Sequence, residues 1–291
     1  MKKLYVSLAV ATLFTSTITY ASDELSWGDK QADTGQLAIS GALRTRFQHK
    51  DFSDEASEGK NNDWKLADLK LVINYENPKW LAQADTRCYQ YDSLCDAVFL
   101  HSAWASYKID TQQTISAGLQ PVDFGFGRFW GSSYYETLFN TLGYEDVHNL
   151  GLKYQLKQQD IQLTLGFYPT DGGNFKGTSK DSSRYTGNFV EADNLNSGTN
   201  IEEKNMWVGR LSKTFTLDEH HEFSSKVGTS FWYSELENKK TDLNGDKFNW
   251  NIFNITNYQN WEGMLLVGQQ KIDNKDKQFP NSSTLGAFDY A

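Results

Sequence analysis

Strict alternation of apolar and polar residues most constrains what this chain can fold into. Around the middle of the chain the apolar members of the alternation are Ile115, Ala117, Leu119, Leu150, Leu152 and Tyr154. Successive side chains of a β-strand point to opposite faces, so this pattern predicts strands with one apolar face and one polar face. Sustained helical heptads are absent, and the expected fold class is therefore all-β.

Extended over the whole chain, the alternation predicts an antiparallel sheet of about eleven strands. Their expected ranges are 37–49, 65–75, 80–89, 97–108, 114–120, 149–154, 161–168, 206–215, 222–233, 247–258 and 261–272. The connections alternate in length, with short turns near 77, 111, 159, 218 and 260 and longer polar loops near 56, 92, 135, 186, 240 and 278. Short turns on one rim and long loops on the other are typical of a transmembrane antiparallel β-barrel.

Aromatic residues recur beside the short turns, where a membrane barrel carries an interfacial girdle. They are Tyr75, Trp80, Tyr107, Tyr154, Phe215, Tyr258 and Trp261. A secreted β-sandwich that binds glycans through its aromatic residues is the alternative, but such a fold need not keep the alternation of loop lengths. The repetition at most of the turns favours the barrel.

The N-terminus carries the pattern of a secretory signal peptide over residues 1–21. Lys2 and Lys3 precede a largely apolar stretch that ends in small residues at Ala21, as an exported precursor requires. Residues 22–291 would then form the barrel domain. No later run is long and apolar enough for a membrane helix, and the net charge of −9 excludes a nucleic-acid partner on bulk electrostatics.

The only two cysteines, Cys88 and Cys95, lie close together in the sequence. In an exported protein such a pair predicts a disulfide across a loop tip. No His or further Cys stands at ligand spacing beside them, so we expect no metal and no cofactor.

Arg44 and Arg46 identify the interior face of the first strand. They alternate with Leu43 and Phe47, and an arginine on a lipid-facing surface would cost about 2–4 kcal/mol at mid-depth. The same phase places further basic residues on the interior face, namely Lys70, Arg87, Lys153, Arg210 and Lys226. Asp68 and Asp85 are the acidic residues expected there. Arginine and lysine rings favour anion passage, whereas the alternative is that these charges pair with interior acids.

A long insert with an aromatic-glycine cluster at 124–131 connects the two strands of the central stretch. Its aromatic content argues against disorder, and we expect the segment 121–148 to fold into the barrel mouth. Arg128 would then lie inside the lumen. His101 and Ser102 cannot pair as base and nucleophile, because adjacent strand residues face opposite ways, and we do not expect an enzyme.

Three stretches resemble Gram-negative outer-membrane porins of the phosphate-selective type. They are 41–47 (GALRTRF), 115–125 (ISAGLQPVDFG) and 144–152 (YEDVHNLGL). The resemblance implies an outer-membrane barrel of about sixteen strands, a homotrimer surrounded by lipid and lipopolysaccharide, with the 121–148 loop narrowing its lumen. It implies passive diffusion of small hydrophilic solutes, although the family does not fix the solute. From this resemblance together with the basic interior residues, we expect a preference for anions such as phosphate. A general or oligosaccharide porin is the alternative within the same family.

The chain departs from the family pattern at its C-terminus. About eleven strands is an odd number, whereas bacterial single-chain barrels have an even number of strands. The sequence stops at Ala291, without the terminal aromatic residue with which the final strand of such porins usually ends. We therefore expect the C-terminal strands to be missing from this sequence.

Overall fold

The computed structural model describes ten stretches of the chain, and in all of them the ordered elements are strands and turns. The described residues are 20–21, 25–49, 62–90, 93–95, 97–126, 147–171, 201–216, 223–238, 244–273 and 282–290. Within these stretches, no helix is long and apolar enough to cross a membrane. The fold of the described chain is all-β, as the alternation predicts.

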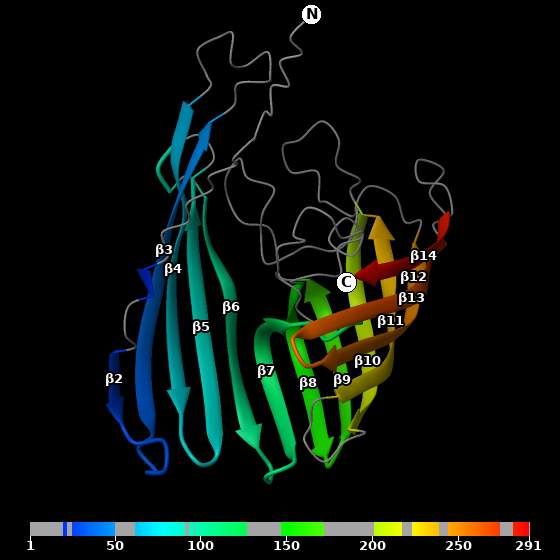
Figure 1. Cartoon of the computed structure of the whole chain (residues 1–291), viewed down its shortest axis with the longest axis horizontal. Helices are drawn as coiled ribbons and strands as arrows, with labels where there is room; N and C mark the ends of the chain where they lie inside the picture. The colour runs from blue at the N-terminus through cyan, green and yellow to red at the C-terminus, as the bar shows by residue number, and fades with distance from the viewer. Residues whose placement is uncertain are drawn as a thin grey trace, which may run out of the picture.

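The strands form one antiparallel sheet in which chain neighbours are also spatial neighbours (Figure 1). Their bounds are β1 Tyr20–Ala21, β2 Leu25–Gly28, β3 Gln36–His49, β4 Asn62–Glu76, β5 Trp80–Tyr89, β6 Ala97–Lys108, β7 Gln113–Pro121, β8 His148–Gln158, β9 Ile161–Asp171, β10 Ile201–Thr216, β11 Phe223–Asn238, β12 Gly245–Tyr258, β13 Trp261–Asp273 and β14 Ser282–Tyr290. β1 and β2 both pair with β3, and the sheet curls so that one face is concave. In the described residues the two ends of the sheet do not pair with each other.

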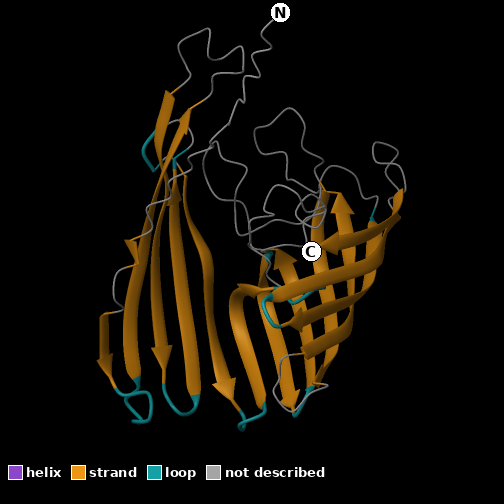
Figure 2. Cartoon of the chain, in the orientation of Figure 1, coloured by secondary structure: helices purple, strands orange, loops and turns teal. Residues whose placement is uncertain are grey.

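The short turns lie together at one edge of the sheet, at 77–79, 109–112, 159–160 and 259–260 (Figure 2). These are four of the five expected short turns, and the fifth, near 218, lies outside the described residues. The described strands belong to a single sheet, whereas a β-sandwich needs two sheets that stack face to face. The sandwich alternative is therefore not supported by the described part of the chain.

The expected strand count was too low, because β1, β2 and β14 were missed. Of these, β14 is the longest. It pairs with β13 from Ile272↔Ser282 to Met264↔Tyr290. Its sequence, SSTLGAFDY, is rich in small and polar residues and lacks a continuous apolar phase. Backbone pairing with a neighbouring strand defines β14, and the sequence of a single strand does not reveal such pairing.

The strand expected at 206–215 begins five residues earlier, at Ile201. A β-bulge interrupts the register between Lys204 and Trp207, and Asn205 there has a φ of +49°. A bulge adds one residue to one strand and so shifts its alternation by one position. The polar start of β10 therefore continues the sheet although its sequence is out of phase with the rest of the strand.

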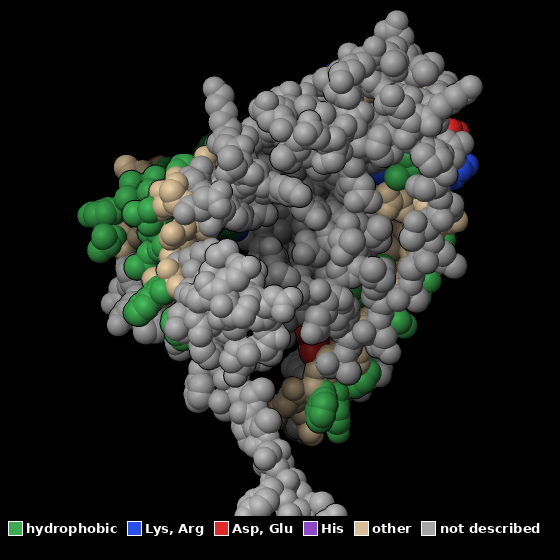
Figure 3. Space-filling view, turned by 90° about the horizontal axis from the view of Figure 1, so that it is seen from above, with side chains coloured by type: hydrophobic (Ala, Val, Ile, Leu, Met, Phe, Trp, Pro, Cys, Tyr) green, Lys and Arg blue, Asp and Glu red, His purple; other side chains and the backbone are tan. Residues whose placement is uncertain are grey.

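Large apolar side chains cover the convex face and remain accessible there. Leu71, Leu152 and Leu211 are 49%, 52% and 47% exposed in the middle of their strands. Viewed from above, hydrophobic side chains gather on the outside of the sheet (Figure 3). Soluble monomers rarely expose apolar patches larger than a few hundred Å², so this face calls for an apolar environment or partner.

Aromatic residues flank this apolar band at both strand ends. Beside the short turns, Trp80 packs on Tyr107 with ring centroids 5.0 Å apart, and Trp261 is 74% exposed. At the opposite ends of the strands, Phe167 packs on Trp207 at 4.5 Å. The apolar band thus has an aromatic border on each side. The border beside the short turns agrees with the sequence pattern, whereas the border at the opposite strand ends was not predicted.

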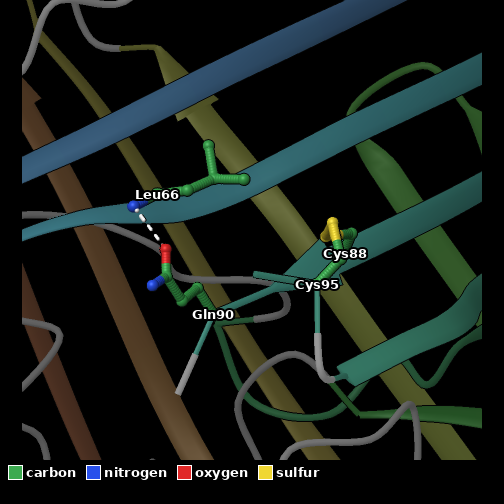
Figure 4. Close-up of a disulfide and its surroundings, with 4 residues drawn as sticks. All are labelled: Leu66, Cys88, Gln90 and Cys95. Carbon is green, nitrogen blue, oxygen red and sulfur yellow. Dashed lines mark hydrogen bonds between the residues drawn. A yellow bond between two sulfur atoms is a disulfide. The ribbon is translucent and has the colours of Figure 1, made fainter. Parts of the chain in front are cut away.

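The two cysteines are joined as expected, at the end of β5 away from the short turns (Figure 4). The Cα atoms of Cys88 and Cys95 are 5.1 Å apart, within the ordinary range for a disulfide. Nearby, the Leu66 amide donates to the Gln90 side-chain oxygen over 2.9 Å. Both contacts tie the loop after β5 to the sheet.

Candidate functional site: the concave face and its infolded segment

After β7 the chain turns onto the concave face instead of continuing along the sheet. Residues 122–126 pack there against side chains from β9 to β13. The Val122 amide donates to the Val147 carbonyl over 2.9 Å, so the two ends of the insert lie together. The buried cluster that results comprises Val122, Phe124, Val147, Tyr168, Met206, Val208, Trp232, Phe253 and Leu266.

Aromatic contacts anchor this infolded segment, which we define as residues 121–126. Phe124 meets Trp232 edge to face at 5.8 Å, and Phe126 meets Phe253 at 6.0 Å. Phe124 and Trp232 are 2% and 1% exposed. The described beginning of the expected 121–148 loop therefore does lie on the concave face, while 127–146, including Arg128, lies outside the described residues.

Polar contacts at both of its ends hold the infolded segment as well. The Lys153 ammonium donates to the Pro121 carbonyl over 2.9 Å and lies 3.5 Å from the Asp123 carboxylate. The same carboxylate accepts a hydrogen bond of 3.2 Å from Gln155. Two side chains of β8 therefore hold this end of the segment. Lys153 contacts both the Pro121 carbonyl and the Asp123 carboxylate, and Gln155 donates to the Asp123 carboxylate.

The second polar anchor is at Gly125. The Arg210 Nε donates to the Gly125 carbonyl over 2.8 Å, and the Gly125 amide donates to the Ser230 hydroxyl over 3.0 Å. The Arg210 guanidinium also lies over the Phe253 ring, 4.8 Å from its centroid. Gly125 has a φ of +60°, which a residue with a Cβ adopts at a cost, and this explains the glycine at that position.

A charged cluster occupies the concave face of β4 to β6. Asp85 is 2% exposed and pairs with Arg87 at 3.1 Å and with Lys70 at 3.3 Å. His101 Nδ1 lies 3.5 Å from the same carboxylate. Ser102 is buried as well, because a bulge interrupts the β5–β6 register here, so the expectation that these two neighbours face opposite ways is wrong. The His101 ring in turn contacts His148, with centroids 4.0 Å apart, so the cluster reaches the strand that follows the insert.

Most of the predicted interior cations have acidic partners. Arg44 pairs with Asp68 across the β3–β4 ladder, and Lys70, Arg87 and Lys153 pair with Asp85 or Asp123. The alternative that interior charges neutralise one another thus holds for four of the seven predicted strand cations. It does not hold for Arg46, Arg210 or Lys226, for which no ion pair is found in the described residues.

Three cations gather on the concave face of β8 to β11. Lys226 lies close enough to Arg210 and Lys157 to be repelled by both. In the sheet, Lys157 is opposite Gln162, whose other neighbour is Ser212. Lys157 was not among the predicted residues. The continued alternation through Leu156 would have shown that Lys157 shares the face of Lys153.

A buried ion pair on the same face was also missed. Lys247 on β12 and Glu203 on β10 are 0% exposed, and their charged atoms are 2.6 Å apart. The Ser234 hydroxyl of the intervening strand donates to Glu203. Because Glu203 lies beyond the bulge at Asn205, its inward direction does not follow from the alternation of the rest of β10.

In the parts of the chain that the structure describes, no group of three His, Cys, Asp or Glu side chains could hold a metal ion. In comparisons with protein-family models, curated proteins and solved structures, nothing matches this chain. The function must therefore be inferred from the residues and their arrangement.

Proposed function

We propose that this protein is an outer-membrane porin through which small hydrophilic solutes diffuse passively, with a preference for anions such as phosphate. The observation that carries the proposal is the division of one curled sheet into two unlike faces. The convex face is an apolar band with aromatic borders, and the concave face is charged and partly filled by the infolded segment. A bilayer matches the first face and a water-filled lumen matches the second.

In this proposal the sheet is the wall of a transmembrane barrel. An open sheet edge in lipid leaves backbone groups without hydrogen bonds, so the proposal requires that the functional wall be closed. The expected signal peptide supports export to the outer membrane, where lipid and lipopolysaccharide would surround the band. The resemblance to phosphate-selective porins further suggests a homotrimer.

The cations without acidic partners support the anion preference. Lys157 and Lys226 lie on the concave face, and Lys226 is close to Arg210, whose Nε holds the infolded segment at Gly125. Charges in a narrow, partly dehydrated passage are screened less than charges on an exposed surface. The side chains that line a pore, rather than the net charge of the protein, determine its ion selectivity.

A general porin is the second candidate, and the ion pairs favour it. Four of the predicted interior cations are neutralised by Asp68, Asp85 or Asp123. Residues of this kind keep the lumen polar without attracting a particular sign of ion. The pore would then select solutes by their size and by the charge of the cations that have no acidic partner among the described residues.

Reversal potentials in a salt gradient test the proposal. The full-length protein is inserted into a planar bilayer, and the double variant Lys157→Met and Lys226→Met is compared with it. We expect the wild-type protein to conduct and the variant to shift toward cation preference. Lys213→Met is the matched control, because Lys213 is on the convex face of β10, with its ammonium 5.1 Å from the Phe215 ring centroid.

Two results would count against the proposal. Folded, inserted wild-type protein that does not conduct would refute the pore. A conducting pore whose reversal potential is the same in the double variant would leave a general porin and remove the anion preference.

A further inference from the structure

Two cations that the sequence assigned to anion binding are instead engaged with the backbone of the infolded segment. Lys153 reaches the Pro121 carbonyl at 2.9 Å, and the Arg210 Nε reaches the Gly125 carbonyl at 2.8 Å. Lys153 is 7% exposed. A side chain that is buried and committed in this way is poorly placed to meet a passing solute.

Both carbonyls need these donors. Pro121 is the last residue of β7, where the ladder with β8 ends, and Gly125 lies beyond it without a ladder partner. A buried carbonyl without a hydrogen bond is costly. Hydrogen bonds from charged donors are the stronger ones. The donors come from β8 and β10, two different strands of the wall, and they hold the first and fifth residues of the infolded segment.

We infer that Lys153 and Arg210 are positioning residues that latch the infolded segment to the wall and thereby set the bore of the pore. This inference rests on the proposed pore function and assigns the regulation of its width to two named side chains. Asp123 completes the first latch by pairing with Lys153, and Ser230 completes the second by accepting from the Gly125 amide.

The aromatic contacts alone do not define the position of the segment. Phe124 and Phe126 pack edge to face on Trp232 and Phe253, and these contacts orient the rings rather than the backbone. The hydrogen bonds fix the backbone between these anchors. Loss of one charge-assisted hydrogen bond shifts a local equilibrium on the order of tenfold, which is enough to change the time-averaged width.

The test measures the entry of uncharged sugars of increasing size, from monosaccharide to tetrasaccharide, into phosphatidylcholine vesicles that contain the full-length protein. Uncharged probes report width and are insensitive to a change in lumen charge. We expect Lys153→Met and Arg210→Met to admit sugars that the wild-type pore excludes, and to raise the entry of the largest permeant sugar on the order of tenfold. Lys153→Arg keeps a charged donor and should retain the wild-type cut-off.

Lys213→Met is the matched control, since Lys213 is on the same strand as Arg210 but on the convex face. It should leave the cut-off unchanged. If either methionine variant fails to insert, Asp123→Asn provides the independent test, because it removes the carboxylate that Lys153 pairs with and should widen the pore in the same direction.

The possible results distinguish a failure of the latch from a failure of the proposed pore. Wild-type vesicles that admit no sugar of any size would refute the pore itself. A wild-type pore whose size limit is unchanged in Lys153→Met, Arg210→Met and Asp123→Asn would overturn the latch and leave the pore intact.

Discussion

Replacing Leu211 by arginine distinguishes a lipid-facing sheet from a water-facing one. Leu211 is on the convex face of β10 and is 47% exposed. It lies four residues from Trp207 and four from Phe215, the aromatic residues that border the band. At about 3.3 Å per residue, each border is roughly 13 Å away along the strand. For a strand tilted by about 45°, Leu211 lies roughly 10 Å from either border along the bilayer normal.

The expected magnitude follows from that depth. An arginine at the midplane of a bilayer destabilises a barrel by about 2–4 kcal/mol, and this cost falls toward the interfaces. The same substitution on a solvated surface usually changes stability by no more than about 0.5 kcal/mol. If β10 crosses a bilayer, Leu211→Arg should therefore reduce the folding equilibrium constant roughly 30- to 700-fold.

Reversible unfolding of the full-length protein in lipid vesicles, followed by denaturant titration, measures this difference. Gln162→Arg is the matched control, because Gln162 is half-buried on the concave face of the neighbouring strand, where an arginine would meet the lumen. We expect the control to lose much less stability than Leu211→Arg. Equal stability of Leu211→Arg and wild type would refute the assignment of the convex face to lipid.

Three further predictions follow from the same structure. In cell fractionation the full-length protein should be found in the outer membrane, and recovery from the soluble periplasm would contradict the barrel. Mass spectrometry of unreduced peptides should detect Cys88 joined to Cys95, a link that contributes about 2–3 kcal/mol by the chain-entropy model, and free thiols in envelope protein would argue against it. Lys247→Met should cost about 3–5 kcal/mol in denaturant unfolding, because it leaves the Glu203 carboxylate buried and unpaired. Adding Glu203→Gln should recover much of that loss, and no recovery would mean that packing rather than charge explains the effect.

The faces of the strands could be predicted from the sequence, because side-chain direction along a strand is a local property of the backbone with a period of two residues. Arg44, Arg87 and Arg210 all lie on the face to which alternation assigned them. The strand bounds were accurate at β5 and β6, although a bulge shifts the register between Asp85 and Thr86. The disulfide was also predictable, since Cys88 and Cys95 are the only cysteines and lie close in the chain.

The alternation fails where backbone pairing overrides it. At Asn205 a bulge shifts the phase, so Glu203 lies inside the sheet and β10 starts earlier than its pattern suggests. β14 has almost no apolar phase and is defined by its hydrogen bonds to β13. Both features depend on a neighbouring strand, and the residues of one strand do not encode the register of the next.

The partners of the interior charges were determined by tertiary structure alone. The Arg44–Asp68 pair requires the register between β3 and β4, and the contacts of Lys153 and Arg210 require a segment that leaves the sheet and returns to its concave face. Away from bulges such as the one at Asn205, the sequence by itself determined which side chains point inward, because that depends on the local backbone. Only the fold decided which of those inward cations are neutralised, which hold the infolded segment and which remain for a solute, because these roles depend on distances between residues that are far apart in the chain.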